Sequence, residues 1–267
     1  MTRRGALLLA LTAGLVLPPV GGGAAPPTKT PGVLLVGVNL GEPGFQVGAV
    51  QGTKVVLARG FEIDLAQVLA KRLGIAQVQF VHEPVFSRLY APGEKTWDVA
   101  VAQITITASR RANVDFSAPY LTADQGVLLA DAAPEPKSLA ALGALQLCAQ
   151  RGTTSAAAVA STVRPTKKVI LFDKQEGLLD ALYQRRCQAV IDDAPILAAL
   201  RRQAPDRYNR VVARLGTPES YGFVVPKGSP LRAMLDRALA KLKQDGTIVT
   251  LEKRWLGGDI AKLPVLR

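Results

Sequence analysis

The sequence is poor in the side chains that most often carry out chemistry. Its 267 residues include one histidine and two cysteines, and aromatic residues make up only 5%. A zinc site built from three or four nitrogen or sulfur ligands cannot be assembled from so few. A serine–histidine–aspartate triad would depend on His82 alone, which disfavours acyl transfer. We therefore expect no metal and no cofactor.

Acidic residues are also scarce relative to basic ones. The chain has 33 Lys and Arg against 21 Asp and Glu, a formal net charge of +12. A nucleic-acid site gathers basic residues on one face, often with stacking aromatics. Here they are scattered in pairs such as Lys71-Arg72, Arg185-Arg186 and Arg201-Arg202. We therefore expect no nucleic-acid partner. A content of 48% hydrophobic and 20% charged residues is typical of a folded globular chain.

The first thirty residues have the pattern of an export signal. Two arginines precede an apolar run over 6–17, and small residues follow at 21–25. The run is about a dozen residues long, and a membrane span needs roughly 20, which disfavours the alternative of an N-terminal anchor. We predict a signal peptide over 1–25, a flexible leader over 26–31 and a periplasmic mature chain.

The rest of the chain alternates short β-rich runs with amphipathic segments, which is typical of an α/β fold. The pattern predicts a buried strand at 33–39. It predicts a helix over 61–73 with acids in the first turn, bases in the last and Gly74 at its end. Another helix is expected to begin at Ser229-Pro230. Segment 46–59 is expected to form a surface hairpin.

Segment 97–121, WDVAVAQITITASRRANVDFSAPYL, carries the clearest chemical signal. A predicted strand ends at Ile104 and is followed by hydroxyl side chains where a helix can begin, and then by Arg110. Hydroxyls, free amides and a guanidinium suit a carboxylate, which arginine binds through two parallel hydrogen bonds. From the residues alone, a capped surface helix with Arg110 paired to Asp115 is an equally good interpretation.

This segment resembles the bacterial extracellular solute-binding proteins of the polar-amino-acid type. Their pattern T-I-T-x-x-R followed by V-D-F-S-x-P-Y stands here at 105–110 and 114–120. Further segments resemble motifs of the same family in the same order, which makes the resemblance specific. They are GFEIDL at 60–65, RGTT at 151–154, AVIDD at 189–193, YGFVVPKGS at 221–229 and the segment 246–257.

The resemblance implies an α/β, two-lobed clamp of the type II periplasmic-binding-protein kind, each lobe a sheet flanked by helices. Lobe 1 would comprise 32–120 and 222–267, and lobe 2 would comprise 125–217. Two crossing strands near 120–125 and 217–222 would form the hinge. The ligand would lie between the lobes, which would close around it.

The resemblance also assigns roles to individual residues. Arg110 and Thr105 would bind the α-carboxylate of an amino acid, Thr153 and Thr154 would add donors from lobe 2, and Asp193 would bind the α-ammonium. The residue types alone equally allow Thr153, Thr154 and Asp193 to be helix N-caps, and the two roles are compatible.

Five more residues are candidates for contact with the ligand: Arg88, Gln103, Phe86, Asn39 and Asp192. Arg88 occupies the position of an arginine that reaches the side chain in members that bind acidic amino acids. Asp192 would repel a side-chain carboxylate if it pointed inward, and Phe86 suits core packing equally well. We predict a polar L-amino acid, acidic or its amide.

The two cysteines, Cys148 and Cys187, resemble a disulfide pair of some amino-acid binders. They lie in or beside two predicted strands of lobe 2, and an exported protein meets oxidising conditions. The alternative is a pair of buried free thiols.

The predicted function is substrate binding for an ABC importer, with a membrane permease as partner and a monomeric chain that is not an enzyme. The alternative is a periplasmic cyclohexadienyl or arogenate dehydratase-like enzyme on the same fold. It would need a general acid in the cleft, for which Glu42, Glu83 and Asp192 are the candidates.

Overall fold

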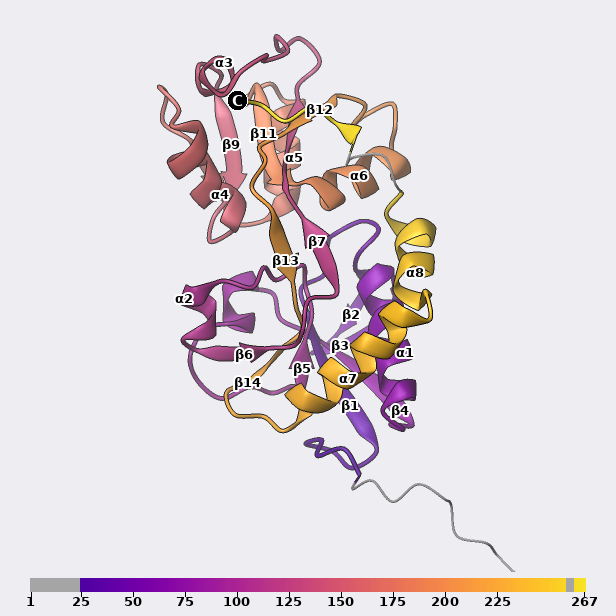
Figure 1. Ribbon diagram of the computed structural model, residues 1–267. Helices are drawn as coiled ribbons and strands as arrows, with labels where there is room; N and C mark the ends of the chain where they lie inside the picture. Colours follow the sequence, from indigo (N-terminus) through magenta and orange to yellow (C-terminus); the bar gives the residue numbers. More distant parts are fainter. Residues whose placement is uncertain (1–24, 258–261) are drawn as a thin grey trace, which may run out of the picture.

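The computed structural model describes residues 25–257 and 262–267 of the 267-residue chain. It consists of two α/β lobes joined by a narrow ribbon (Figure 1). The predicted signal peptide lies outside the described residues except at its last position. Within the described ranges, no helix has the length and apolar character needed to cross a membrane.

The first lobe is built on a seven-stranded mixed sheet with the order β2-β3-β4-β1-β5-β14-β6. Its strands are β1 (Val33–Val38), β2 (Val47–Gln51), β3 (Lys54–Arg59), β4 (Gln77–His82), β5 (Val99–Ala100), β6 (Val114–Phe116) and β14 (Val224–Pro226). β1 pairs in parallel with both β4 and β5, and its alternating apolar side chains are buried. The helices α1 (Phe61–Arg72), α7 (Leu231–Gln244) and α8 (Thr247–Trp255) pack together beside the sheet.

The second lobe contains a five-stranded sheet with the order β10-β9-β11-β8-β12. Its strands are β8 (Gln125–Leu129), β9 (Leu147–Gln150), β10 (Ile170–Phe172), β11 (Ala189–Asp193) and β12 (Val211–Arg214). The helices are α3 (Leu139–Gly143), α4 (Thr154–Ala158), α5 (Gln175–Tyr183) and α6 (Ala194–Gln203). The two-lobed α/β fold class predicted from the sequence is confirmed.

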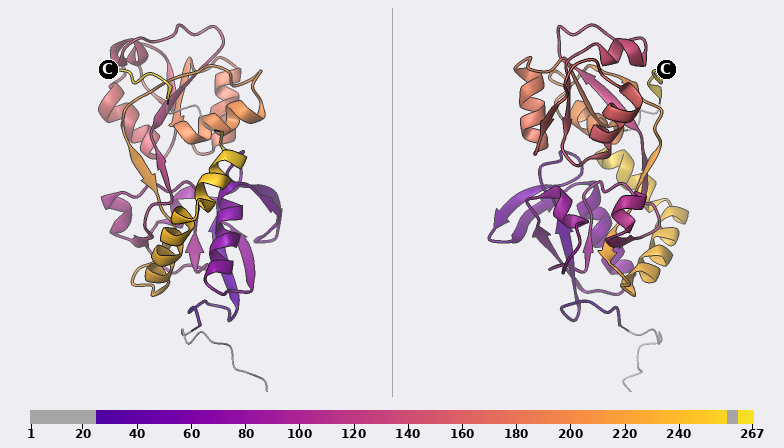
Figure 2. Two further views of the ribbon diagram at one scale, coloured as in Figure 1. Left: turned by 45° about the vertical axis from the view of Figure 1, so that its right-hand side comes forward. Right: turned by 90° about the vertical axis from the view of Figure 1, so that its left-hand side faces the viewer.

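The strands β7 (Leu121–Ala123) and β13 (Glu219–Tyr221) form an antiparallel ribbon between the two sheets. Figure 2 shows this ribbon passing from one lobe to the other in both views. Most strands of the first sheet precede β7 in the sequence, but β14 follows β13. The chain returns to the first sheet after it has completed the second lobe. The chain therefore crosses between the sheets twice through this ribbon.

The last residues of the chain lie on the second lobe. The backbone N–H of Arg214 in β12 donates to the carbonyl of Pro264 at 2.8 Å, and that of Leu266 donates to the carbonyl of Arg214 at 2.9 Å. Leu266 is buried in the core of the second lobe. The prediction that 222–267 belongs to lobe 1 is therefore wrong for 262–267, because their backbone groups pair with the edge of the second sheet.

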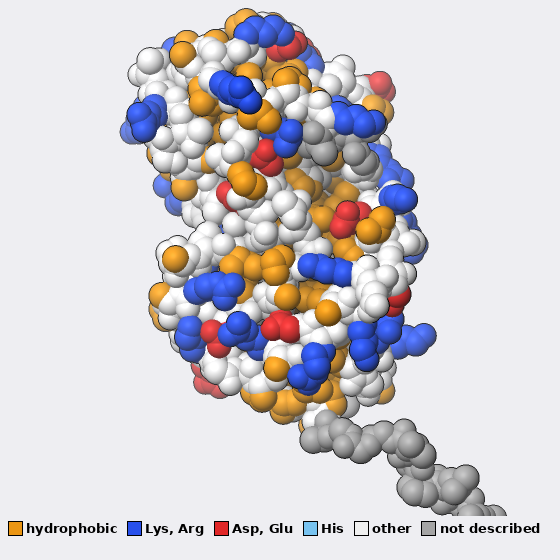
Figure 3. Space-filling model, viewed as in Figure 1, with side chains coloured by type: hydrophobic (Ala, Val, Ile, Leu, Met, Phe, Trp, Pro, Cys, Tyr) orange, Lys and Arg blue, Asp and Glu red, His pale blue; other side chains and the backbone are white. Residues whose placement is uncertain are grey.

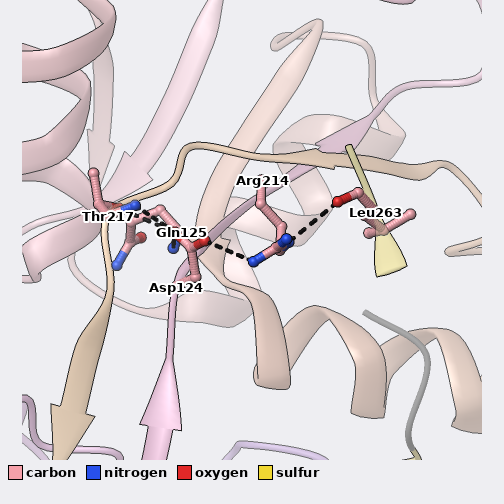
Figure 4. Close-up of polar contacts among 5 residues, drawn as sticks. All are labelled: Asp124, Gln125, Arg214, Thr217 and Leu263. Carbon is pink, nitrogen blue, oxygen red and sulfur yellow. Dashed lines mark hydrogen bonds and ion pairs between the residues drawn. The ribbon is translucent and has the colours of Figure 1, made fainter. Parts of the chain in front are cut away.

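Asp124 joins this C-terminal segment to the hinge (Figure 4). Its carboxylate contacts the guanidinium of Arg214 at 3.1 Å and accepts a hydrogen bond of 2.7 Å from the backbone N–H of Thr217. The same guanidinium donates to the carbonyl of Leu263 at 3.3 Å. Asp124 and Arg214 together thus connect the start of β8, the approach to β13 and the C-terminal segment.

Local sequence explains why α1 begins where it does. Gly60 has φ +131°, and a Cβ at this position would lie 2.1 Å from the carbonyl oxygen of Phe45. Only glycine allows this approach, which accounts for the first residue of the GFEIDL motif. The predicted helix over 61–73 is confirmed, as is the hairpin in segment 46–59, formed by β2 and β3.

Cys148 and Cys187 form a disulfide bond with a Cα–Cα distance of 5.9 Å. Both side chains are buried, and the bond is possible because β9 and β11 are parallel neighbours, with Cys148 opposite Val190. The alternative of two free thiols is thereby rejected.

Replacing both cysteines with alanine should lower the free energy of unfolding. The disulfide closes a loop with a sequence separation of 39 residues, for which the chain-entropy model gives about 3–4 kcal/mol. Urea unfolding followed by circular dichroism measures the loss. A reducing agent should reproduce it in the wild type and leave the C148A/C187A variant unchanged. Equal stability of the oxidised wild type and the variant would contradict a stabilising role.

Candidate functional site

A narrow cavity of about 30 Å³ lies between the lobes and is lined by residues from both. Nine of the ten residues that the sequence predicted to contact a ligand line this cavity. These are Asn39, Phe86, Gln103, Thr105, Arg110, Thr153, Thr154, Asp192 and Asp193. The fold thus brings together side chains that are up to 154 positions apart in the sequence.

Arg110 is buried in the wall formed by the first lobe, with 6% of its surface exposed. It lies in the short helix α2 (Ala108–Arg111), whose N-cap Thr107 accepts a hydrogen bond from the Arg110 backbone. The guanidinium donates to the carbonyls of Thr105 at 2.9 Å and Gly152 at 3.3 Å. Gly152 belongs to the second lobe, so Arg110 already contacts both lobes.

The predicted alternative pairing of Arg110 with Asp115 does not occur. Asp115 contacts Lys227 at 3.1 Å instead. Across the described ranges, Arg110 makes no ion pair with a carboxylate, and its guanidinium lies 4.4 Å from the ring centroid of Tyr90. A buried guanidinium that contacts carbonyls and aromatic rings but no carboxylate is well suited to bind an anion.

Asp193 is the corresponding buried anion in the second lobe, with 6% of its surface exposed. It precedes α6 but makes no side-chain cap. Its carboxylate accepts hydrogen bonds from Gln125 at 2.7 Å, from Ser155 at 3.3 Å and from the hydroxyl of Tyr221. Burial, followed by the nearby charges of Asp192 and Glu219, raises its pKa to about 7.

The two threonines of the second lobe differ in their contacts. Thr153 caps α4, because its hydroxyl accepts from the Ala156 N–H at 3.2 Å and donates to the carbonyl of Gln150 at 2.7 Å. The hydroxyl of Thr154 instead donates to Glu219 at 2.7 Å. The N-cap interpretation is therefore correct for the Thr153 side chain, whereas Thr154 faces the junction of the lobes.

Glu219, in the hinge strand β13, was missed by sequence reasoning. Its carboxylate accepts hydrogen bonds from Thr105 of the first lobe at 2.8 Å, from Thr154 of the second lobe at 2.7 Å and from Gln125 at 3.1 Å. Because a hydroxyl has one proton to donate, both threonine protons are directed to Glu219. In the sequence, the only indication that Glu219 belongs to the site was its carboxyl side chain within the predicted hinge segment.

Gln103 lines the cavity, but its side chain is engaged with Glu62. Both the backbone N–H and the side-chain amide of Gln103 donate to the Glu62 carboxylate. Glu62 is fully buried and also accepts hydrogen bonds from Gln46, at 2.6 Å, and from the hydroxyl of Tyr120. Burial raises the pKa of Glu62 to about 7 despite these donors. The sequence pattern had identified Glu62 only as an acid in the first turn of a helix.

Asn39 and Phe86 form part of the first lobe's wall. The Asn39 amide donates to the carbonyl of Glu83 at 2.7 Å. The ring of Phe86 is 5.5 Å from that of Tyr90 and 5.6 Å from the guanidinium of Arg110. Phe86 therefore combines packing with a position at the cavity.

Arg88 does not line the cavity. It is exposed in the turn Phe86–Leu89, and its carbonyl accepts a hydrogen bond of 2.8 Å from Lys95. The structure thus gives no support to the predicted contact between Arg88 and a ligand side chain, because the turn directs Phe86 toward the cavity and Arg88 away from it.

Carboxyl groups outnumber cations around the cavity. Glu42, Asp192 and Asp193 line it, against Arg110 alone. Burial and the charge of Asp192 raise the pKa of Glu42 well above its usual value, and burial raises the pKa of Asp192 to about 6. Elsewhere, Lys and Arg are dispersed over both lobes on the face shown in Figure 3. No group of three or more potential metal ligands occurs in the part of the chain that the structure describes.

Comparison with known proteins places this architecture in a family. Residues 34–258 match the bacterial extracellular solute-binding proteins, family 3. The chain belongs to this family. Its members bind small amino-acid ligands and work with the membrane components of ABC transporters.

Three relatives of this solute-binding protein are informative. The glutamine-binding protein GlnH of a Bacillus subtilis ABC transporter is 29% identical over 76% of this chain and 74% of its own. An ancestral arginine-binding protein bound to glutamine is 32% identical with a TM-score of 0.72, over 86% of this chain and all of its own. The ancestral amino acid-binding protein AncCDT-1, a precursor of cyclohexadienyl dehydratase, is 31% identical with a TM-score of 0.71, over 84% of this chain and 95% of its own.

The buried carboxyl groups should make the unliganded protein less stable as the pH rises. The pKa of Glu62 is about 7 in the folded protein, above the ordinary 4.5, so the folded state retains a proton that the unfolded state releases between these values. The melting temperature should therefore fall between pH 5 and pH 8. The E62Q variant should have a smaller slope, measured by differential scanning calorimetry.

Glu94 is exposed and provides a matched control. E94Q should have the slope of the wild type. A melting temperature that rises from pH 5 to pH 8, or an E62Q slope equal to that of the wild type, would show that Glu62 does not retain its proton on folding.

Proposed function

We propose that this protein is the extracytoplasmic substrate-binding component of an ABC amino-acid importer and that it captures a polar L-amino acid between its lobes. One observation supports this most directly. A buried guanidinium, Arg110, and a buried carboxyl group, Asp193, line the same cavity, and neither has an ion-pair partner among the described residues. An α-amino acid carries the two complementary charges on one carbon, so its carboxylate would contact Arg110 and its ammonium would contact Asp193.

The charges around the cavity favour an amide or cationic side chain over an acidic one. Glu42 and Asp192 line the cavity, and Arg88, the cation expected to attract an acidic side chain, is exposed elsewhere. A side-chain carboxylate would lose its hydration beside these buried carboxyl groups, with no cation to pair with. Glutamine is the ligand named for GlnH and present in the ancestral structure, and it lacks this disadvantage.

The location and partners follow from the same proposal. The signal pattern at 1–25 favours export to the periplasm, and the disulfide suits an oxidising compartment. The partner would be the membrane permease of the importer, and the protein would act as a monomer that closes about its hinge. The lobes are expected to comprise 32–120 with 222–257, and 125–217.

A dehydratase-like activity is the second candidate. Glu42 and Asp192 have raised pKa values in the cavity and can hold a proton near neutral pH, as a general acid must. The relative AncCDT-1 is named as a precursor of such an enzyme. Glu83 does not line the cavity. Sustained release of phenylpyruvate from prephenate, or of phenylalanine from arogenate, would favour this candidate over simple binding.

A thermal-shift panel of the twenty amino acids tests the binding proposal. A ligand at 100 times its Kd adds about 2.7 kcal/mol of stability, enough to raise the melting temperature by several degrees. We expect a shift with glutamine and none with glutamate. R110M should remove the shift because the ligand carboxylate loses its partner.

Arg111 supplies the matched control for that variant. It is exposed, does not line the cavity and stacks on Phe116. R111M should retain the ligand shift. No shift with any amino acid would reject the proposed function, and an unchanged shift in R110M would reject the carboxylate assignment.

Ligand affinity should depend on pH in the opposite direction from stability. An ammonium group binds the ionised form of Asp193, whose pKa is about 7 in the unliganded protein. The Kd should be nearly constant above pH 8 and rise below pH 7, by up to about tenfold per pH unit. Isothermal titration calorimetry from pH 5.5 to 8.5 measures this. A Kd that does not change across that range would exclude Asp193 as the ammonium partner.

A further inference from the structure

Two side chains from opposite lobes meet at the end of the inner cavity that faces the hinge. The hydroxyl of Thr105 in the first lobe lies 3.4 Å from that of Thr154 in the second lobe, and both residues line the cavity. Beyond them lies another cavity of about 480 Å³, which is also lined by Thr105 and Thr154 and by Glu219. Glu219 does not line the inner cavity, so the two threonines stand between its carboxylate and a ligand.

The end of β13 that follows Glu219 is attached to the first lobe. The backbone N–H of Ile106 donates to the carbonyl of Ser220 at 2.8 Å, and Thr105 forms an antiparallel bridge with Tyr221. The hydroxyl of Thr105 completes this attachment with its hydrogen bond of 2.8 Å to Glu219. The carboxylate of Glu219 is therefore fixed to the first lobe.

The hydrogen bond between Glu219 and Thr154 has a different consequence, because it joins the two lobes. Thr154 is the first residue of α4 in the second lobe, and its hydroxyl donates at 2.7 Å to Oε2, the same oxygen that accepts from Thr105. The other oxygen accepts at 3.1 Å from the amide of Gln125, the first residue of β8. Hydrogen bonds to an ionised carboxylate are stronger than those between neutral groups. Two of these three bonds reach the second lobe.

We propose that Glu219 is an interlobe latch, a positioning residue that favours the closed clamp by holding Thr154 of the second lobe against Thr105 of the first. The proposal rests on the proposed function, because the latch would stabilise closure around an amino acid. The bond to Thr154 forms only when the lobes meet. It therefore slows the opening of the clamp and the release of the ligand, and it leaves the entry of the ligand into the open clamp unaffected.

Stopped-flow kinetics of the variants E219M and T154V test the latch, with L-glutamine or the amino acid of the largest thermal shift as ligand. Methionine keeps an unbranched side chain and removes both acceptors, and valine keeps the shape of threonine and removes its proton. We expect each variant to release the ligand at least about tenfold faster, as for the loss of a hydrogen bond to a charged group. The association rate constant should stay within about twofold of the wild type. S220A, at the neighbouring residue of β13, should keep both wild-type rates.

The double variant distinguishes a latch from a direct contact between Thr154 and the ligand. If Thr154 acts through Glu219, E219M/T154V should release the ligand at the rate of E219M alone. Effects that multiply in the double variant would show that Thr154 acts independently of Glu219 and would overturn the proposal. A wild-type dissociation rate in E219M would overturn it as well.

Small-angle X-ray scattering without ligand distinguishes failure of the latch from failure of the proposed function. We expect E219M and T154V to have a larger radius of gyration than the wild type and S220A, because their lobes separate more readily. If an amino acid binds, the dissociation rates decide, and wild-type rates in both variants reject the latch alone. If no amino acid binds, the proposed function is rejected, and the scattering decides: an unchanged radius of gyration in both variants then rejects the latch too.

Discussion

Arg110 and Asp193 are a buried guanidinium and a buried carboxyl group at one cavity, and neither makes an ion pair with a described residue. The guanidinium has two carbonyls and two aromatic rings around it, and the carboxyl group has an amide and two hydroxyls. Burying a charge without its counter-ion is costly, and these donors and acceptors offset only part of that cost. A zwitterion placed between the two groups would recover the missing interactions.

A continuous path of contacts connects the core of the first lobe to Asp193. Glu62 accepts a hydrogen bond from Tyr120, whose ring lies 6.1 Å from that of Tyr221, and Tyr221 donates to Asp193. Both tyrosine hydroxyls are buried, and burial raises their pKa values well above the usual range, so they remain protonated donors. Tyr120 directly precedes β7, and Tyr221 is the last residue of β13 in the hinge ribbon. The position of the carboxyl group in one lobe thus depends on packing in the other.

Local patterns predicted those parts of the molecule that short-range chemistry determines. The apolar spacing in α1, its glycine at the C-terminal end and the hydroxyl before Arg110 all have local physical causes. Such local patterns could not predict contacts between segments that are far apart in the sequence. Nothing near Glu219 indicates that it accepts from Thr105 and Thr154, and nothing in 262–267 indicates pairing with β12. Arg88 lies outside the cavity for a related reason, because a turn of four residues decides which side chain faces it.

The C-terminal segment has a practical consequence for measuring the lobes. The residues at the start of the described chain lie beside the first sheet, where the backbone of Lys29 donates to Asp98, whereas Arg267 accepts from Leu139 of the second lobe. The two ends of the described chain are thus attached to different bodies. Fluorophores placed near residues 26 and 267 would report the separation of the lobes directly, without a label inside either core or near the cavity.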